Sequence, residues 1–271
     1  MSSVLLVLHP HSQEATLLAE TASAWCRARG HAVHLYEGPN GQVPKADFAM
    51  SLGGDGTMLR AVELALSLDI PVIGVNLGRM GYLAEVEPAG LEPALEAIFA
   101  GRYILEERMV LDVTVERADA SRFNFLALNE AVVEKTGPGH TIRVAVRISG
   151  RSFLTYVADG LLVCTPTGST AYNLSARGPV ASPLLRALVL TPIAPHLVFD
   201  RSLVLGPDED VEMVLLDGQK AAAVVDGAHV IALTAGDSVR CKTADRAARF
   251  ISFGELDFHA VLRSRFGLTD R

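Results

Sequence analysis

The most concentrated chemical signal in the sequence is Gly53-Gly54-Asp55-Gly56-Thr57, which follows the apolar run 48–52 and precedes a helical pattern. Glycine lets the backbone approach a ligand closely, and the free amides and dipole of a helix N-terminus attract phosphate. A carboxylate at such a site repels phosphate, so its presence suggests a role in catalysis or metal binding. Two tasks fit Asp55: it accepts a proton from an attacking hydroxyl, or it holds Mg²⁺. The alternative is a plain strand-to-helix turn in which Asp55 and Thr57 cap the helix.

A second signal is the polar pair Asn129 and Glu130 inside the apolar run 125–133, which is predicted to be a strand. A carboxamide can read a purine edge and a carboxylate can bind ribose hydroxyls, so the pair suits nucleoside recognition. Taken alone, the pair favours a strand end or bulge with solvated side chains. The residues themselves leave both interpretations open.

A third signal is the hydroxyl-rich segment 159–175, which begins with Asp159-Gly160 and contains the breakers Pro166 and Gly168. This composition disfavours the interior of a strand or helix and favours a hydrogen-bonding loop. Ser169 or Thr170 is then expected to cap a following helix. A plain serine- and threonine-rich turn with an N-cap is the alternative.

Two common nucleotide motifs are missing from this sequence. It contains no GxxxxGK[ST], and Leu59 stands where the third glycine of GxGxxG would be. The GGDGT segment instead resembles the signature of NAD kinases and of the related diacylglycerol and sphingosine lipid kinases, with phosphofructokinases more distantly similar. The segment 159–175 closely resembles the NAD kinase pattern, and lipid kinases do not share it at this length. The chain is therefore identified as resembling an ATP- or polyphosphate-dependent NAD kinase.

The resemblance implies a reaction and a set of residues. Asp55 is expected to deprotonate the adenosine-ribose 2′-hydroxyl of NAD, while Mg²⁺, carried by the phosphates of ATP or polyphosphate rather than by a protein metal site, offsets charge. Arg60 and His140 are weaker candidates, since a surface arginine and an ordinary loop histidine explain them as well. The residues expected to bind NAD or the donor are Gly54, Gly56, Arg60, Asn129, Glu130, His140, Asp159, Thr170, Ala171, Tyr172, Asn173, Leu174 and Ser175.

The sequence departs from the family pattern at several positions. Many members carry an arginine two residues before the Asp-Gly of the third segment, where this chain has Val157. Many members also continue the late Asp-Gly turn with glutamine, where Ala228 follows Asp226-Gly227 here. These changes bear on donor choice and on the tightness of NAD binding. The presence of Asp55, Asn129 and Glu130 argues against an inactive relative.

The elements that must position these residues follow from periodicity. Strands are expected at 4–8, 32–36, 48–52 and 72–75, and helices at 14–29, 57–68 and 91–99, which is an α/β pattern. The apolar period then changes from helical to two, as in Leu111, Val113 and Val115. The sequence therefore predicts an α/β nucleotide-binding domain at 1–100, a mostly-β, sandwich-like NAD-binding domain at 101–250, and a helical tail at 251–271 capped by Asp257, with its packing left open.

Composition narrows the class of protein. The net charge is −7 and the basic residues are dispersed, which disfavours nucleic-acid binding. No apolar run reaches the length of a membrane helix, and the three cysteines lack metal-ligand spacing, so a cytoplasmic protein without membrane contact is expected. The family resemblance suggests a homodimer or homotetramer formed through exposed sheet edges.

Two other functions remain to be compared with an NAD kinase. A lipid kinase could use the same GGDGT chemistry on a membrane alcohol, but it calls for an apolar groove or a basic membrane-facing surface. The acidic charge and the polar loop at 165–170 argue against both. A regulatory module that senses NAD or NADP without turnover would keep the binding loop and lose the base, whereas Asp55 is present.

Overall fold

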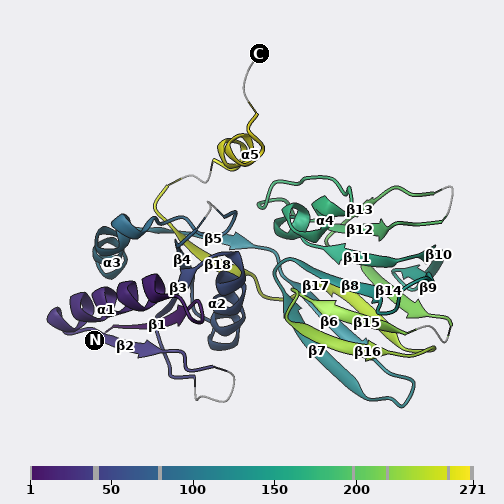
Figure 1. The fold of residues 1–271 in the computed structure, drawn as a ribbon, viewed down its shortest axis with the longest axis horizontal. Coiled ribbons are helices and arrows are strands. Elements are labelled where there is room, and N and C mark those ends of the chain that lie inside the picture. Colours follow the sequence, from purple (N-terminus) through teal and green to yellow (C-terminus); the bar gives the residue numbers. More distant parts are fainter. Residues whose placement is uncertain are drawn as a thin grey trace. The chain divides into compact units, whose positions relative to one another are not determined.

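The structure is a computed structural model that describes residues 2–38, 43–78, 81–196, 199–217, 220–254 and 257–268. It divides into two compact units (Figure 1). Unit 1 comprises Met1–Glu107 and Ala248–Arg271, and unit 2 comprises Arg108–Ala247. The last segment of the chain, whose packing the sequence leaves open, thus belongs with the N-terminal unit.

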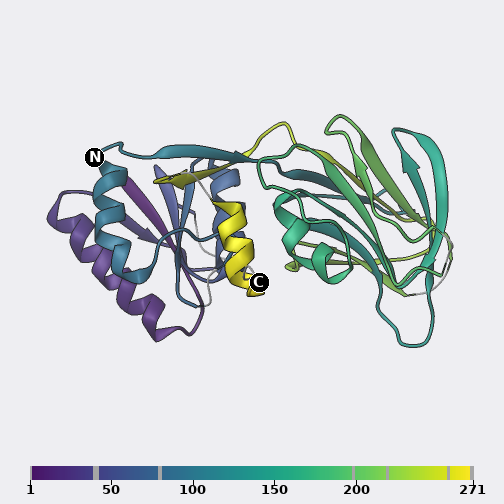
Figure 2. The same cartoon turned by 90° about the horizontal axis from the view of Figure 1, so that it is seen from above.

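Unit 1 is an α/β layer built on one six-stranded sheet, with strand order β2-β1-β3-β4-β18-β5. Strands β1 to β4 and β18 pair in parallel. Helices α1 and α3 cover one face of this sheet and α2 covers the other (Figures 1 and 2). The elements are β1 (Ser3–Leu8), α1 (Gln13–Ala28), β2 (Ala32–Leu35), β3 (Phe48–Gly53), α2 (Asp55–Leu68), β4 (Val72–Asn76), the 3₁₀ turn η1 (Pro88–Gly90), α3 (Leu91–Phe99), β5 (Ile104–Arg108), β18 (Ala248–Ser252) and α5 (Phe258–Phe266).

The helices of unit 1 begin and end where local chemistry predicts. The Ser12 hydroxyl caps α1 by accepting a hydrogen bond from the Ala15 amide, and buried Ala15, Ala19 and Ala22 let the helix lie close to the sheet. The Asp257 carboxylate caps α5 through the Ala260 amide, as the sequence predicts. Within the described residues, no helix is both long enough and apolar enough to cross a membrane.

Unit 2 consists of two antiparallel sheets, with strand orders β10-β9-β14-β17-β6-β7 and β13-β12-β11-β8-β15-β16. Alternate residues of both sheets share one core, including Val113, Val144, Val133 and Leu161, which is the arrangement of a β-sandwich. An α/β part followed by a mostly-β part is therefore confirmed. The elements are β6 (Leu111–Glu116), β7 (Arg122–Ala127), β8 (Glu130–Lys135), β9 (Ile142–Ile148), β10 (Arg151–Ala158), β11 (Gly160–Cys164), the 3₁₀ turn η2 (Thr167–Thr170), α4 (Tyr172–Ser175), β12 (Leu188–Ile193), β13 (Leu203–Leu205), β14 (Asp210–Leu215), β15 (Ala221–Val225), β16 (His229–Leu233) and β17 (Ser238–Thr243).

One strand prediction in unit 2 is wrong. The run 125–133 is not a single strand, because β7 ends at Ala127 and β8 begins at Glu130 in the other sheet. Leu128 and Asn129 carry the chain between the sheets, so the polar pair lies at a crossover. Asp159 lies at a second crossover, between β10 and β11.

Candidate functional site

The GGDGT segment lies at the end of β3 and the start of α2. A Cβ on Gly53 would lie 2.4 Å from Thr57 Oγ1, so packing excludes a side chain there. A Cβ on Gly54 or Gly56 would meet no heavy atom within 4 Å, so these two glycines border open space. Gly54 is the N-cap and offers no side chain, so the alternative in which Asp55 and Thr57 cap the helix is wrong. The partial positive charge of the helix N-terminus at this turn favours an anion.

Asp55 stands in the first turn of α2, with its two carboxylate oxygens in different surroundings. Oδ1 is buried without a hydrogen-bond partner among the described residues, and a Cβ on Gly81 would lie 2.1 Å from it. Oδ2 lies 3.7 Å from Nη2 of Arg265, whose guanidinium carbon is 4.7 Å from the centre of the Tyr82 ring. The sequence did not indicate Gly81 or Arg265 as site residues. Arg60 is exposed on α2.

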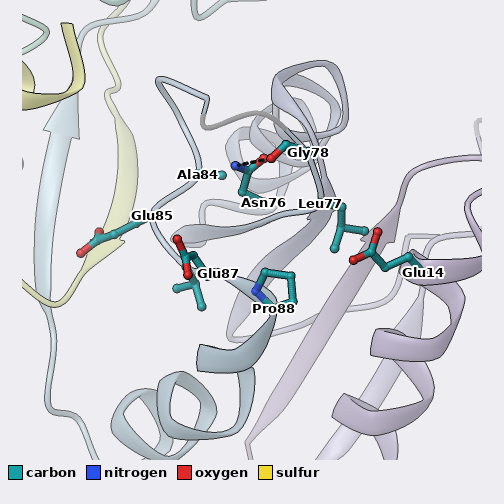
Figure 3. Close-up of a pocket in the computed structure, with 9 residues that line it drawn as sticks. Glu14, Asn76, Leu77, Gly78, Ala84, Glu85, Glu87 and Pro88 are labelled. Atoms are coloured by element: carbon teal, nitrogen blue, oxygen red, sulfur yellow. Dashed lines mark hydrogen bonds between the residues drawn. The ribbon is translucent and has the colours of Figure 1, made fainter. Parts of the chain in front are cut away.

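A pocket of about 380 Å³ lies where β4 ends (Figure 3). Asn76 at the end of β4 donates a hydrogen bond to the Gly78 carbonyl, 3.3 Å away, and the carboxylates of Glu14, Glu85 and Glu87 also line the pocket. Three carboxylates would repel a triphosphate. The amides of the GGDGT turn are therefore the better place for the donor phosphates within unit 1.

In unit 2, the Asn129–Glu130 segment is held by a carboxylate from a distant turn. Asp226, at the end of β15, accepts hydrogen bonds from the amides of Leu128 (2.7 Å), Asn129 (2.9 Å) and Glu130 (3.0 Å). These three amides would otherwise be free to continue a strand ladder, which explains the break between β7 and β8. Asp226 is a structural anchor that the sequence indicated only as part of a resembling Asp-Gly turn.

The Glu130 side chain is 8% exposed, and its Oε2 has no hydrogen-bond partner among the described residues. Burial, and then the nearby Asp226 carboxylate, raise the pKa of Glu130 to about 8, whereas a hydrogen bond from the Tyr172 backbone opposes this shift. At neutral pH the carboxyl group is thus largely protonated. It can then donate as well as accept a hydrogen bond, which suits contact with ribose hydroxyls or a base edge.

The hydroxyl-rich loop is fastened directly to the Asn129 segment. The Thr165 hydroxyl donates to the Leu128 carbonyl (2.5 Å), and the Thr165 amide donates to the Asn129 carbonyl (2.9 Å). A Cβ on Gly168 would lie 2.2 Å from that same Asn129 oxygen, so only glycine permits this approach. The loop and the polar pair therefore form one unit, which the sequence presented as two separate signals.

The expected helix cap in this loop is wrong. Ala171 is the N-cap of α4, and no side chain caps that helix. Ser169 instead exchanges hydrogen bonds with the backbone of Ala181, and the Thr170 hydroxyl donates to the Thr167 carbonyl. These hydroxyls therefore bond to the backbone of Thr167 and Ala181 rather than to the amides of α4.

Tyr172 contacts residues at both ends of β8. Its backbone opposes the pKa rise of Glu130, and its hydroxyl is hydrogen-bonded to Glu134. Burial, and then the charge and hydrogen bond of Glu134, raise the pKa of Tyr172, and the charge of Asp159 adds to this. Lys135 pairs with Asp159 at 2.6 Å. Four of the expected site residues, Asn129, Glu130, Asp159 and Tyr172, therefore gather around β8.

The other expected residues differ in what they offer a ligand. Asn173 is fully buried, where its side chain donates to the Ser169 and Pro179 carbonyls and accepts from Thr191. Its side chain therefore holds the loop together. Ser175 is exposed at the end of α4, Ala171 and Leu174 are partly buried, and His140 is exposed in the loop between β8 and β9.

The structure also shows where the two positions lie at which the sequence differs from the family pattern. Val157 lies on β10 directly opposite Arg143 of β9, so a cationic side chain occupies the neighbouring position in this sheet. Ala228 is exposed after the Asp226-Gly227 turn. Within the described ranges, no group of three or more His, Cys, Asp or Glu side chains could hold a metal ion.

Comparisons with known proteins agree on one family. Residues 35–103 match the ATP-NAD kinase N-terminal domain, and residues 128–253 match the ATP-NAD kinase C-terminal domain. The NAD kinase of Heliobacterium modesticaldum is 40% identical over 278 residues, covering 98% of each chain. An NAD kinase from Archaeoglobus fulgidus, solved in complex with ATP, is 26% identical with a TM-score of 0.77 and covers 99% of each chain. Yeast NADH kinase complexed with NADH has the same fold, with a TM-score of 0.88 at 22% identity over all of this chain and 89% of the other. The chain is a member of the NAD kinase family.

Proposed function

We propose that this chain transfers the terminal phosphoryl group of ATP to the adenosine-ribose 2′-hydroxyl of NAD, giving NADP and ADP, with Asp55 as the general base. The 2′-oxygen forms a bond to the γ-phosphorus while the bond from that phosphorus to the β,γ-bridging oxygen breaks. The hydroxyl proton passes to the Asp55 carboxylate. Relatives named NAD kinase that match nearly the whole chain support the reaction.

The observation that carries the role of Asp55 is its placement. The carboxylate stands in the first turn of α2, between two glycines that border open space, with no hydrogen bond to Oδ1 among the described residues. The Asp55 side chain is 39% exposed, so a substrate hydroxyl can donate a hydrogen bond to the carboxylate. The same turn offers amides to the donor phosphates.

We assign the adenosine of NAD to unit 2. Asn129 is suited to a base edge, and Glu130, largely protonated at neutral pH, is suited to ribose hydroxyls. Thr170, Ala171, Tyr172, Leu174, Ser175 and Asp159 would complete the walls of this site. Asn173 would contribute by holding the loop. Arg60 on α2 and His140 between β8 and β9 are exposed, and their side-chain N–H groups would suit a phosphate.

ATP is the donor that a solved relative supports, since the Archaeoglobus fulgidus enzyme was obtained in complex with it. Polyphosphate is a second candidate because the GGDGT turn can bind phosphate through backbone amides without reading a base. Mg²⁺ bound by the donor phosphates would offset their charge.

We further propose that the chain works in the cytoplasm as a homodimer or homotetramer. Its cysteines, Cys26, Cys164 and Cys241, are free and buried, which fits a reducing compartment. The edge strands β13 and β16 expose Val204 (60%) and Val230 (63%), and exposed apolar strand edges favour association. Sedimentation showing only monomer at micromolar concentration would remove the oligomer.

The experiment that tests the function is NADP formation from NAD with ATP and Mg²⁺, comparing the unmodified chain with Asp55→Asn. The exposed Asp245→Asn serves as a matched control, and polyphosphate replaces ATP in a parallel reaction. We expect Asp55→Asn to lose activity by orders of magnitude while still binding NAD, and Asp245→Asn to stay near the unmodified rate. An unmodified chain that binds NAD but forms no NADP with either donor would instead be a nucleotide sensor.

A further inference from the structure

The C-terminal helix places a cation beside the proposed base. Arg265 of α5 lies with its Nη2 3.7 Å from Asp55 Oδ2, and its guanidinium stacks over the Tyr82 ring. The side chains of Arg265 and Asp55 are only 33% and 39% exposed, so the pair is partly shielded from solvent. We propose that Arg265 is a positioning residue for phosphoryl transfer, which holds the Asp55 carboxylate in its reactive orientation. This inference rests on the proposed role of Asp55 as base.

The geometry of the pair suits a base that must still accept a proton. A separation of 3.7 Å is within ion-pair range but too long for a good hydrogen bond. Arg265 therefore attracts Oδ2 without occupying its lone pairs. On the other side, the Gly81 backbone packs against Oδ1 so closely that a Cβ would collide with it. The carboxylate is thus confined from both sides, while its oxygens remain able to accept a proton.

The helix that carries Arg265 has defined ends and one partly buried face. The helix is capped by Asp257 at its start and ends at Gly267 in the left-handed conformation, with φ of 58°. Phe258, Val261 and Leu262 are its partly buried residues, and Arg265 continues their stripe by the spacing of an α-helix. Arg263, two residues earlier, therefore points in a different direction.

The chain that leads to α5 is also anchored near Asp55. Strand β18 pairs with β4, and after it the Phe253 amide and the Ser252 hydroxyl donate to Glu85 Oε1 at 3.0 and 3.1 Å. Glu85 belongs to the same short segment as Gly81 and Tyr82. That segment therefore contacts the base, the arginine and the strand that carries the arginine into place. Such shared support is what precise positioning of a reactive group requires.

The test compares Arg265→Gln, Arg265→Lys and Arg265→Ala with Arg27→Gln, which removes the same charge from the exposed last turn of α1. We expect Arg265→Gln to lower kcat about ten-fold or more, with KM for NAD within about two-fold, because a misplaced base slows transfer more than binding. Arg265→Lys should recover part of the rate. Dilute guanidinium ion, far below denaturing concentrations, should raise the rate of Arg265→Ala but not that of Asp55→Asn.

The outcomes separate this inference from the proposed function. If Asp55→Asn is inactive while Arg265→Gln keeps the kcat of Arg27→Gln, Asp55 keeps its role and the positioning role of Arg265 is wrong. A higher kcat in Arg265→Gln would show an inhibitory contact and also overturn it. A lower rate accompanied by a lower melting temperature, with no recovery of rate by lysine or guanidinium ion, would reduce Arg265 to a structural role. Full activity of Asp55→Asn would overturn the proposed base itself.

Discussion

Replacing Glu130 by glutamine should change how the stability of the nucleotide-free protein depends on pH. The carboxyl group is 8% exposed, and burial together with the Asp226 carboxylate raises its pKa from 4.5 to about 8. In the unfolded chain the group loses its proton near the ordinary value. Between these two pH values the unfolded state therefore binds fewer protons than the folded state, so stability falls as the pH rises.

The magnitude follows from that interval. Each pH unit inside it lowers the free energy of unfolding by about 1.4 kcal/mol. The full contribution is present below about pH 4.5 and lost above about pH 8, so the loss over the interval is on the order of 5 kcal/mol. Glutamine keeps the shape and the acceptor for the Tyr172 amide but cannot ionise. Its advantage over glutamate should therefore grow from under about 1 kcal/mol at pH 5 to about 5 kcal/mol at pH 9.

The assay is urea unfolding of both proteins at pH values from 5 to 9 without nucleotide, followed by circular dichroism. Glu116→Gln is the control, because Glu116 lies at an exposed strand end of the same unit. A difference between Glu130→Gln and the unmodified chain that stays constant over this range would refute the reasoning. It would mean that Glu130 is charged in the folded protein or solvated in a way that the structure does not show.

Two glycine substitutions test the packing of the site. Gly81→Ala places a Cβ 2.1 Å from Asp55 Oδ1, so the carboxylate must rotate. We therefore expect kcat to fall about ten-fold or more with little change in melting temperature. An unchanged kcat would contradict the close packing. Gly168→Ala places a Cβ 2.2 Å from the Asn129 carbonyl oxygen, where backbone must move; we expect roughly 1–3 kcal/mol of destabilisation and weaker NAD binding by calorimetry. A Gly168→Ala protein with normal stability and affinity would show that the loop and the polar pair are not coupled.

Most helices and strands were predicted because residues close in sequence determine where they begin, end and bury one face. The helix expected at 14–29 is observed as Gln13–Ala28, and the GGDGT segment lies at the expected strand-to-helix junction. The alternation of Val113 and Val115, or of Val144 and Val146, reports burial on one face of a strand and needs no knowledge of distant residues. Such features are set by neighbours in sequence.

Features that depend on distant residues could not be predicted in this way. The break at Leu128 and Asn129 depends on a carboxylate that arrives from Asp226, 97 residues beyond Asn129. The apolar run gives no sign of that contact, so the sequence predicted one strand. The approach of Arg265 to Asp55 depends likewise on the return of the chain to unit 1, and an arginine on a short C-terminal helix has no pattern that reveals its partner. The loop hydroxyls indicated hydrogen bonding correctly but not their partners.

The course of β18 has a consequence for how the protein is made. This strand separates β4 from β5 in the first sheet, yet it is synthesised after the whole of unit 2. Unit 2 is continuous in the chain and can fold as soon as it leaves the ribosome, whereas the earlier strands of unit 1 must wait with a gap between β4 and β5. The part of the molecule that is made first is therefore completed last. A nascent chain cannot finish the sheet that carries Asp55 until the segments that carry Asn129 and Glu130 have been synthesised.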